Sequence, residues 1–415
     1  MGLAPYGKHE SQQVQKFEEL TKQELVDIKE DGSIILNMDY FDYATGLRMC
    51  NDEKWQELFG LPRREQESDI SQPYMDIALA IQNITEEIIL KLAATCVKLT
   101  GLRNLVMAGG VALNCVANGK LLNSGIIDHL WIQPAAGDAG GALGAALAAR
   151  YIWQGEERKV DPSCADAMQG AYLGPEFSSI DIQRMCRTYN APNMQYEDFS
   201  RLCGEVARLL EQGKVVGWFQ GRMEYGPRAL GNRSILGDPR HPEMQKKLNL
   251  KIKFREGFRP FAPSVLAEDS HEYFDLKTAS PYMLLVDMVN DKRCNPLPED
   301  HAELNMHDRL YFLRSDIPAI THVDYTARIQ TVHRETNQRY WQLINTFKEQ
   351  TGYGLLVNTS FNVRGEPIIC TPDDAYRCFM RTEMDYLVVA NQLFSKVEQP
   401  EWHEGVKWQD QYELD

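Results

Sequence analysis

The sequence predicts an α/β protein built in two parts. Stretches with the three-to-four-residue apolar periodicity of helices alternate with short apolar runs typical of buried strands. The chain of 415 residues is long for a single domain. Its periodic pattern loosens between residues 151 and 180, where we place the boundary. We therefore expect one domain over residues 1–160 and a second over residues 170–415.

The first part opens on charged sequence with weak periodicity. The stretch "NDEKWQELFGLPRREQESD" predicts a helix that is broken at Gly60 and Pro62. A longer amphipathic helix begins near Pro73, and Gly101 is a plausible C-cap for it. Its apolar face is predicted from residues that recur at intervals of three and four: Ile77, Ile81, Ile84, Ile88 and Leu92.

Two short strands and a helix should follow in the first part. The apolar runs "NLVMAGG" at 104–110 and "LWIQP" at 130–134 predict the strands. The run "GDAGGALGAALAAR" at 137–150 predicts a helix of small residues that packs closely against another element.

The second part repeats the alternation of helices and strands. We expect helices at 199–212, near 241–250, at 335–350 and over "DDAYRCFMRT". Strands are expected over "KVVGWFQG", at 326–332, at 354–362 and over "DYLVVANQLFSK". No internal repeat or low-complexity tract interrupts them.

Composition limits the class of protein. Hydrophobic residues make up 43% and charged residues 25%, as in ordinary globular enzymes. The net charge of -15 argues against a protein that coats nucleic acid. No apolar run has membrane-spanning length and no signal peptide is evident, so a cytoplasmic location is expected.

Cysteine and histidine spacing gives no metal site. None of the nine cysteines forms a CxxC pair, which favours reduced thiols over a disulfide framework. The nine histidines contain no HxxH or HxxxH pair.

Arginines gather in two segments of this acidic chain. "GRMEYGPRALGNRSILGDPR" at 221–240 carries Arg222, Arg228, Arg233 and Arg240 among glycines and prolines. "KFREGFRPFAPS" follows with Lys253, Arg255 and Arg259. Stiff basic loops of this kind indicate a pocket for a polyanion. The alternative is a set of structural arginines that tie loops to carboxylates.

Two glycine-rich junctions are weaker candidates. Gly109 and Gly110 follow a strand and would let the backbone approach a phosphate, with Asn114 as a hydrogen-bond donor. The alternative is an ordinary tight turn. Asp138 lies between glycines at a strand-to-helix junction, where a carboxylate holds a metal or serves only as a helix N-cap.

A polar cluster ends a predicted strand at 356–367, "LVNTSFNVRGEP". Its short donors suit phosphate or amide recognition at a strand end, and the alternative is an Asx or Ser turn. They are Asn358, Thr359, Ser360 and Asn362.

Taken together, these motifs carry a family resemblance. "MGLAPYG", "GGVALN", "GDAGGALGAAL", "GPRALGNRSIL", "FRPFAPSV", "TARIQTV" and "LVNTSFNVRGEPI" occur in that order across essentially the whole chain. In combination they resemble the O-carbamoyltransferases of the NodU/CmcH type. The resemblance implies a partial actin-like ATPase domain (ASKHA, Kae-type) followed by a YrdC-like α/β domain. It implies that carbamoyl phosphate and ATP form carbamoyl adenylate in the YrdC-like part. The carbamoyl group then passes to a small-molecule hydroxyl acceptor in the actin-like part, beside a metal.

The resemblance also assigns roles to residues of this sequence. The anion pocket would use Lys253, Arg255, Arg328, Ser360 and Asn362, with Arg228 and Arg259 as supports. Gly109, Gly110 and Asn114 would face nucleotide, and Asp138 would bind a divalent metal, either magnesium or iron.

The sequence departs from the family pattern at its front. Family members carry an Asp-rich phosphate loop and a His-x-x-x-His type metal motif before "MGLAPYG", which here begins at Met1. We therefore expect Asp138 to lack histidine partners and the first part to be unstable alone, or completed by a partner polypeptide. A homodimer is the other arrangement that the sequence leaves open.

Two other functions compete with carbamoyl transfer. One is a truncated, inactive nucleotide-binding or scaffold protein, which the missing front favours and the arginine-rich loops disfavour. The other is a relative of the tRNA threonylcarbamoylation enzymes, against which the absence of a broad basic surface argues. No nucleic-acid or membrane partner is expected, and the sequence does not identify the acceptor.

Overall fold

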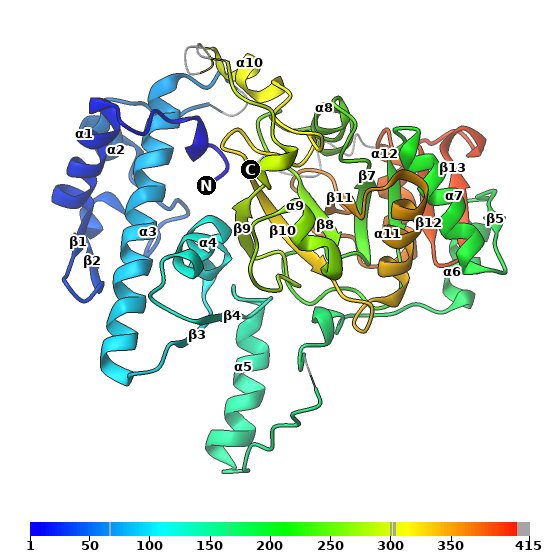
Figure 1. Cartoon of the computed structure of the whole chain (residues 1–415), viewed down its shortest axis with the longest axis horizontal. Coiled ribbons are helices and arrows are strands. Elements are labelled where there is room, and N and C mark those ends of the chain that lie inside the picture. The colour runs from blue at the N-terminus through cyan, green and yellow to red at the C-terminus, as the bar shows by residue number, and fades with distance from the viewer. Residues whose placement is uncertain (66–67, 165, 299–300, 302–303, 405–415) are drawn as a thin grey trace. The chain divides into compact units, whose positions relative to one another are not determined.

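The computed structural model describes the chain apart from residues 66–67, 165, 299–300, 302–303 and 405–415, and divides into two compact units (Figure 1). The first unit comprises Met1–Met107, Asn114–Trp131 and Leu304–Leu310. The second comprises Ala108–Leu113, Ile132–Glu303 and Tyr311–Asp415. The domain boundary expected between residues 160 and 170 stays a prediction.

The first unit is organised around one long helix, α3 (Gln72–Thr100). Gly101 ends it in the left-handed conformation with φ 71°, as the sequence predicts. Gly60 likewise ends α2, with φ 69°. The other elements of this unit are η1 (Ala4–Tyr6), α1 (Gln12–Leu20), η2 (Thr21–Leu25), β1 (Val26–Ile28), β2 (Ile34–Leu36), η3 (Met38–Tyr40), α2 (Asp52–Phe59), β3 (Asn104–Met107), α4 (Cys115–Asn123) and β4 (His129–Ile132, whose last residue belongs to the second unit).

The predicted apolar face of α3 is wrong, although the helix itself is confirmed. Of the five residues proposed for that face, only Ile84 is buried, and Leu92 is 42% exposed. The buried stripe follows a seven-residue repeat that includes polar side chains: Met75, Leu79, Gln82, Glu86, Ile89 and Ala93. Hydrogen bonds compensate the polar members, since Gln82 donates to Glu86 at 2.7 Å.

A segment distant in sequence completes the first unit. Leu304–Leu310, which includes most of α10 (Met306–Tyr311), belongs to it. The guanidinium of Arg309 donates to the carbonyl oxygens of Tyr6 at 3.1 Å and Pro5 at 3.4 Å. These bonds join this segment to the turn that opens the chain.

The second unit is built on a nine-stranded mixed sheet in the order β5-β13-β12-β6-β7-β11-β8-β10-β9. β10 with β8 and β12 with β6 are parallel pairs, and the other recorded neighbours are antiparallel. Its strands are β5 (Met194–Gln195), β6 (Val216–Phe219), β7 (Arg233–Gly237), β8 (Ala262–Leu266), β9 (Leu285–Met288), β10 (Thr326–Val332), β11 (Leu355–Ser360), β12 (Tyr386–Val389) and β13 (Gln392–Ser395). The α/β class is therefore confirmed.

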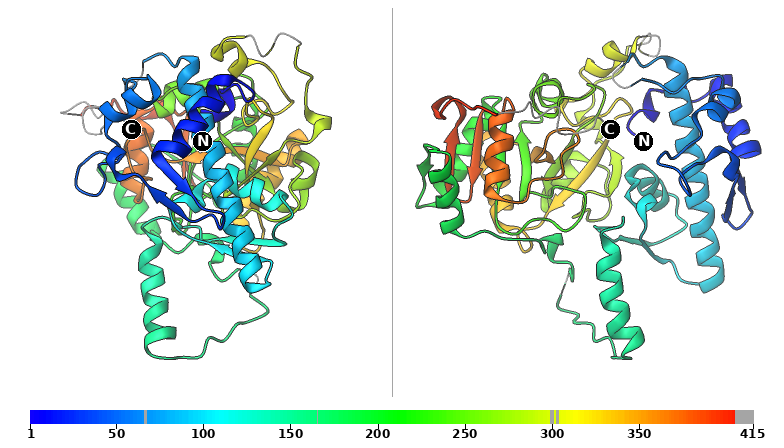
Figure 2. Two further views of the ribbon diagram at one scale, coloured as in Figure 1. Left: turned by 90° about the vertical axis from the view of Figure 1, so that its left-hand side faces the viewer. Right: turned by 180° about the vertical axis from the view of Figure 1, so that it is seen from behind.

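Helices cover both faces of this sheet. α7 (Phe199–Glu211) and α11 (Gln338–Thr351) pack on one face (Figure 1). Their apolar residues share a core with Trp218 and Val388. α12 (Pro372–Arg381) covers the other face, with α6 (Ser179–Thr188) beside it, and α12 comes to the front when the molecule is seen from behind (Figure 2). The remaining helical elements are η4 (Gly110–Leu113), α5 (Gly140–Ala148), η5 (Ala149–Trp153), η6 (Gln169–Ala171), α8 (Met244–Lys247), η7 (Leu248–Lys253), η8 (Ala267–Asp269), α9 (Ser270–Tyr273), η9 (Asp291–Arg293) and η11 (Lys396–Glu398).

Three sequence expectations need correction. The stretch at 385–396 forms a hairpin of β12 and β13, because Ala390 adopts a φ of 52° between them. The helix near 241–250 is the short α8, which runs on into η7. α5 exists, but none of its residues is buried in the described part of the chain, so its expected close packing is wrong there. Glycine and alanine present little apolar surface that would need cover.

The described residues include no helix that is both long and apolar enough to span a membrane.

Candidate functional site

The candidate site in the second unit centres on a buried lysine. Lys253 ends η7 (Leu248–Lys253) and is 3% exposed. Its ammonium donates to Asn362 Oδ1 at 2.7 Å, to Asn362 O at 2.9 Å and to Ser360 Oγ at 3.2 Å, and it also contacts Ser360 O. Ser360 Oγ donates to Asn362 Oδ1 at 2.7 Å. The structure therefore brings together three of the predicted pocket residues at the end of β11.

A second cationic residue, Arg255, follows this lysine by two residues. Phe254 adopts a φ of 49°, which is rare for a residue with a side chain and turns the chain sharply between Lys253 and Arg255. Arg255 Nε donates to Asn249 Oδ1 at 2.8 Å. Burial, followed by the positive charge of Arg255, lowers the pKa of Lys253 to about 7. An anion bound nearby would favour the charged lysine.

Arg328 lies on the same face and at the same end of the sheet as Ser360. Asn358 Nδ2 donates to Ser264 Oγ at 2.9 Å and to Gln330 Oε1 at 3.0 Å, so these three side chains share one face. Arg328 precedes Gln330 by two residues and Ser360 follows Asn358 by two. β11 runs antiparallel to β8, and β10 runs parallel to β8. The step back from Gln330 to Arg328 and the step forward from Asn358 to Ser360 therefore lead toward the same end of the sheet. Within the described residues, the buried Nε of Arg328 has no hydrogen-bond partner.

The loop with Arg259 is held through its backbone. Asn249 Nδ2 donates to the carbonyl oxygen of Arg259 at 2.9 Å, and Gln245 Nε2 donates to the same oxygen at 3.2 Å. Asn249 is fully buried. Asn249 thus fixes both the Arg255 side chain and the Arg259 backbone, and the sequence analysis did not identify it.

A buried carboxylate shapes the loop that carries Arg228. Glu224 is 5% exposed, and its Oε1 accepts backbone N–H groups from Leu230 at 2.7 Å, Asn232 at 2.8 Å and Arg233 at 3.2 Å. A carboxylate that accepts several backbone N–H groups closes a loop tightly. Sequence analysis missed Glu224 because its partners are backbone groups six to nine residues away.

Three side chains hold the same loop from other elements. Asn358 Nδ2 donates to Ala229 O at 3.1 Å, Gln330 Nε2 donates to Leu230 O at 2.8 Å, and Tyr172 Oη donates to Leu230 O at 2.7 Å. Asn358 is therefore a buried support of the Arg228 loop. It was predicted only as a donor at a strand end.

Gly231 lets the loop turn against α11. Its φ is 109°, and a Cβ at this position would lie 2.1 Å from Cδ1 of Tyr340, which is fully buried. No residue other than glycine fits without displacing that ring.

The Arg228 loop meets the two glycine-rich junctions within the second unit. Arg228 Nη2 donates to Leu113 O at 3.4 Å. Tyr225 Oη donates to Ala139 O. The Cα of Gly226 lies so close to the Pro134 carbonyl that a Cβ would approach its oxygen to 2.8 Å. Arg228 is thus placed beside η4, whereas sequence analysis grouped it with the Lys253 pocket only as a support.

Gly109 and Gly110 lie at the start of η4. Gly109 has a φ of 97° and its N–H donates to Ala136 O at 2.7 Å, which joins the two junctions. These facts confirm a tight turn at Gly109. A nucleotide contact at either glycine stays a prediction.

Asn114 and Asp138 differ in their surroundings. Asn114 lies in the first unit, caps α4 by accepting the N–H of Ala117 at 3.2 Å, and donates to Gln82 at 3.0 Å. Asp138 is exposed. The N-cap alternative for Asp138 is wrong, because Ala139 is the N-cap of α5. Nucleotide contact by Asn114 and metal binding by Asp138 stay predictions.

Two of the four arginines at 221–240 are structural. Arg233 is fully buried, donates to the carbonyl oxygens of Gln220 at 2.7 Å and Asn232 at 3.0 Å, and lies 3.6 Å over the Phe219 ring. Burial lowers its pKa to about 10. Arg240 pairs with Asp238 at 2.7 Å. The structural alternative, an arginine tied to a carboxylate, is confirmed for Arg240, whereas Arg233 is held by backbone carbonyl oxygens instead.

The described residues contain no group of three or more histidine, cysteine or acidic side chains that could hold a metal ion. What the site offers is positive charge. Lys253 presents it beside the neutral oxygens of Ser360 and Asn362, and Arg255 follows Lys253 by two residues and contacts Asn249. Arg328 presents it from β10 at the same end of the sheet. Such an arrangement can bind and orient anions.

Comparison with known proteins identifies the family. A model of the carbamoyltransferase N-terminus matches residues 1–147, and a model of the carbamoyltransferase C-terminus matches residues 207–396. An uncharacterized protein of Synechocystis is 55% identical, over 100% of this chain and 66% of its own length. Nodulation protein NolO of Bradyrhizobium diazoefficiens is 36% identical, over 95% of this chain and 65% of its own length. Nodulation protein U of Rhizobium tropici is 34% identical, over 68% of this chain and 42% of its own length. The chain thus spans between 42% and 66% of these relatives.

Proposed function

This chain belongs to the carbamoyltransferase family, and we propose that it takes part in an ATP-dependent carbamoyl transfer. The carbamoyl group would pass from carbamoyl phosphate to a hydroxyl of a small molecule such as a sugar or antibiotic-like acceptor. In this proposal the second unit contains the YrdC-like fold and forms carbamoyl adenylate. The matched N-terminal region contributes the actin-like fold, to which the acceptor binds.

One observation carries the proposal. Lys253 contacts Ser360 and Asn362 where β11 ends, and Arg328 lies at the same end of the sheet, in a protein whose net charge is -15. Among the described residues, the Nε of Arg328 is buried there without a hydrogen-bond partner. A buried donor left unpaired costs about 1–3 kcal/mol. A phosphate oxygen would satisfy this donor and favour the charged form of Lys253.

The chemistry needs two anions in one place. Carbamoyl phosphate releases phosphate on hydrolysis, and an oxygen of the resulting carbamate then attacks the α-phosphorus of ATP with loss of pyrophosphate. Lys253, Arg255 and Arg328 would offset the repulsion between the two substrates and hold them in line. The acceptor hydroxyl would then attack the carbamoyl carbon, with AMP as leaving group.

A metal fits the described residues poorly. Asp138 is exposed, and a lone carboxylate is a weak transition-metal site. Metal binding by Asp138 therefore stays a prediction, and no step of the proposed reaction is assigned to it.

The experiment follows product formation without acceptor. The purified chain is incubated with ATP and carbamoyl phosphate, and phosphate, pyrophosphate and carbamoyl adenylate are measured. Production of all three, lost in Arg328→Ala and retained in Arg334→Ala, supports the proposal. Arg334 is an exposed arginine two residues beyond β10 and serves as the matched control.

No product from a protein whose circular dichroism shows a folded chain would contradict the proposal. Product formation that survives Arg328→Ala would place the reaction elsewhere in the molecule. An inactive nucleotide-binding or scaffold protein would instead bind nucleotide and release no pyrophosphate.

A further inference from the structure

A carboxylate in the turn after β11 has no role in the reaction as proposed so far. Glu366 closes the turn that follows Ser360 and Asn362. Its Oε2 accepts the N–H of Val363 at 3.0 Å, and its own N–H donates to Val363 O at 3.3 Å. Gly365, with a φ of 75°, lets the chain reverse between these two bonded residues. Glu366 therefore fixes the turn with both its side chain and its backbone.

This turn orients the side-chain amide of Asn362. Asn362 Nδ2 donates to the carbonyl oxygen of Glu366 at 2.6 Å. A side-chain amide has one accepting oxygen and one donating NH2 group. Asn362 Oδ1 is thereby directed to the Lys253 ammonium at 2.7 Å, and it accepts the Ser360 hydroxyl at 2.7 Å. The reversed amide would point its NH2 group at the ammonium, so that two donors would face each other.

Arg381, the last residue of α12, lies beside the carboxylate of Glu366. Arg381 Nη1 is 3.9 Å from Glu366 Oε1, and Arg381 Nε donates to Glu404 Oε1 at 2.8 Å. The side chains of Arg381 and Glu366 are 9% and 13% exposed. Solvent and salt screen so enclosed a pair much less than a surface pair. Attraction to Arg381 thus helps to keep the Glu366 carboxylate in place against the turn.

We propose that Glu366 is a positioning residue of the anion pocket. It closes the turn so that the Asn362 amide directs its oxygen to Lys253, and it acts through Asn362 rather than on a substrate. This inference rests on the proposed function, because it assumes that the pocket around Lys253 binds the phosphate groups of the substrates. The alternative is a carboxylate that only stabilises the fold.

The first test measures the binding of inorganic pyrophosphate by isothermal titration calorimetry, which needs no turnover. Glu366→Ala removes the acceptor of the Val363 N–H and should weaken binding about tenfold. Glu366→Gln keeps an oxygen that can accept this N–H and should bind within about threefold of the wild type. In Asn362→Ala no amide is left to orient, so adding Glu366→Ala should weaken binding much less than in the wild type.

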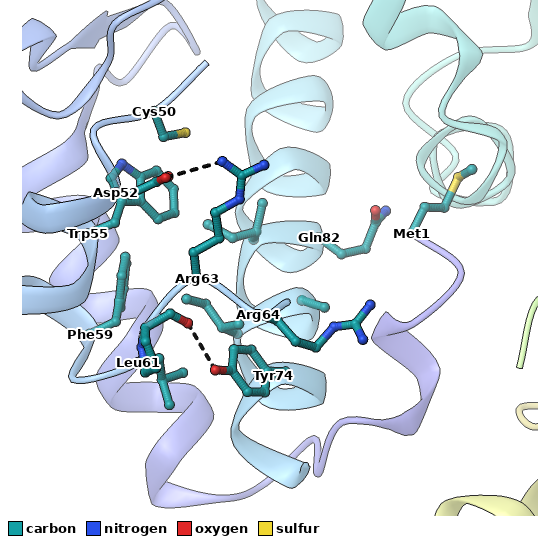
Figure 3. A pocket seen from close by; sticks show the side chains of 14 residues that line it. Met1, Cys50, Asp52, Trp55, Phe59, Leu61, Arg63, Arg64, Tyr74 and Gln82 are labelled. Atoms are coloured by element: carbon teal, nitrogen blue, oxygen red, sulfur yellow. Dashed lines mark hydrogen bonds and ion pairs between the residues drawn. The ribbon is translucent and has the colours of Figure 1, made fainter. Parts of the chain in front are cut away.

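Two carboxylates elsewhere serve as matched controls. Asp374 accepts the N–H groups of Thr371 at 2.9 Å and Cys370 at 3.3 Å, so Asp374→Ala removes the same kind of backbone contact. Asp52 pairs with Arg63 at 3.1 Å in the first unit (Figure 3), so Asp52→Ala removes the same kind of charge pair. Both controls should bind pyrophosphate within about twofold of the wild type, because neither contacts the turn.

A second test measures stability and needs no ligand. Urea unfolding gives the effect of Glu366→Ala in the wild type and in Lys253→Met. If Glu366 acts on Lys253 through the Asn362 amide, Glu366→Ala should lower the free energy of unfolding less in the Lys253→Met background. Asp374→Ala should have the same effect in both backgrounds. If Glu366→Ala fails to fold, Glu366→Asp takes its place, since the shorter side chain draws the oxygen back from Val363.

The outcomes separate this inference from the proposed function. If the wild type binds pyrophosphate and Glu366→Ala binds it equally well, the proposal is overturned and the proposed function stands. Glu366→Gln as impaired as Glu366→Ala would also overturn it, because the effect would then come from the charge. If the wild type neither binds pyrophosphate nor releases it from ATP, the proposed function fails. Unfolding then decides the role of Glu366, and equal effects of Glu366→Ala in both backgrounds would overturn it.

Discussion

The ammonium group of Lys253 lies 2.7 Å from Oδ1 of Asn362, so a fully buried cation is held by neutral oxygens. Neutral acceptors stabilise a buried charge less than a carboxylate does. Burial, followed by the positive charge of Arg255, lowers the pKa of Lys253.

Lys253 should make the protein more stable as the pH rises from about 7 to about 10.5. Its pKa is about 7 in the folded protein, against 10.5 for an unperturbed lysine. Between these values the unfolded state binds more protons, so the free energy of unfolding rises with pH, by at most about 1.4 kcal/mol per unit. Urea unfolding of wild type and Lys253→Met at several pH values measures this. The free energy of unfolding of the wild type minus that of the variant should increase with pH. A difference that stays constant with pH would contradict the lowered pKa of Lys253.

Arg228 and Arg240 should separate function from stability. Arg240 donates to Asp238, whose side chain is 4% exposed, so Arg240→Ala leaves a buried carboxylate unpaired and should cost about 2–4 kcal/mol. Arg228 donates to the neutral carbonyl oxygen of Leu113 at 3.4 Å and lies beside η4. Arg228→Ala removes no partner from a buried carboxylate of the kind that Arg240 pairs with, so we expect turnover to fall at least about tenfold, or about 1.4 kcal/mol of transition-state stabilisation, with a smaller loss of stability than in Arg240→Ala.

Both variants are compared by urea unfolding and by pyrophosphate release. Equal loss of stability in the two, with turnover unchanged in Arg228→Ala, would assign Arg228 a structural role like that of Arg240.

Glu224 should act on activity through the loop that it closes. Glu224→Ala leaves the buried N–H groups of Leu230, Asn232 and Arg233 without an acceptor, at a cost of about 1–3 kcal/mol for each that finds no other partner. Glu224→Gln keeps an oxygen that can accept the same groups and should restore much of the stability and turnover. Urea unfolding and kcat/KM for pyrophosphate release measure both effects. If Glu224→Gln is as impaired as Glu224→Ala, the negative charge matters more than the loop geometry.

Gly231→Ala and Gly144→Ala should change stability in opposite directions. At Gly231 a Cβ would clash with the Tyr340 ring at 2.1 Å in a backbone conformation with φ 109°, so a loss of about 2 kcal/mol or more is expected. Gly144 lies within α5, and a Cβ there meets no atom within 4 Å. Alanine at this position should add up to about 1 kcal/mol through helix propensity. The melting temperatures of both variants, measured by thermal unfolding, check this prediction. An unaltered melting temperature in Gly231→Ala would contradict the close contact between Gly231 and the Tyr340 ring.

Sequence periodicity located β6, β10 and β11 because these strands are short, apolar and bounded by turn residues. It missed β5, β7, β8 and β9, and β7 and β8 lie in the segments that were expected to be basic loops. The strand expected at 326–332 is β10 itself. The buried face of α3 could not be obtained in this way. Gln82 and Glu86 occupy the buried stripe, and only their partners across the unit explain how polar side chains are stable there.

The sequence could also not separate Arg228 from Arg233. Both lie among the same glycines, and Arg233 follows Arg228 by five residues. Arg233 is in β7 and faces the carbonyls of Gln220 and Asn232, whereas Arg228 is in the loop before it. Strand register decides which arginine is enclosed, and register depends on pairing with β6 and β11, which no local motif records.

The contact between Arg309 and the opening turn has a consequence for synthesis on the ribosome. The first unit lacks one of its own segments until residues 304–310 have left the exit tunnel. At about 5–20 residues per second, this is a wait on the order of tens of seconds. During that time Tyr6 and Pro5 have no Arg309 to bond, so this turn lacks two of the hydrogen bonds that it has in the folded unit. Ribosome-bound intermediates stalled before and after this segment should therefore differ in the protease resistance of α1 and α3.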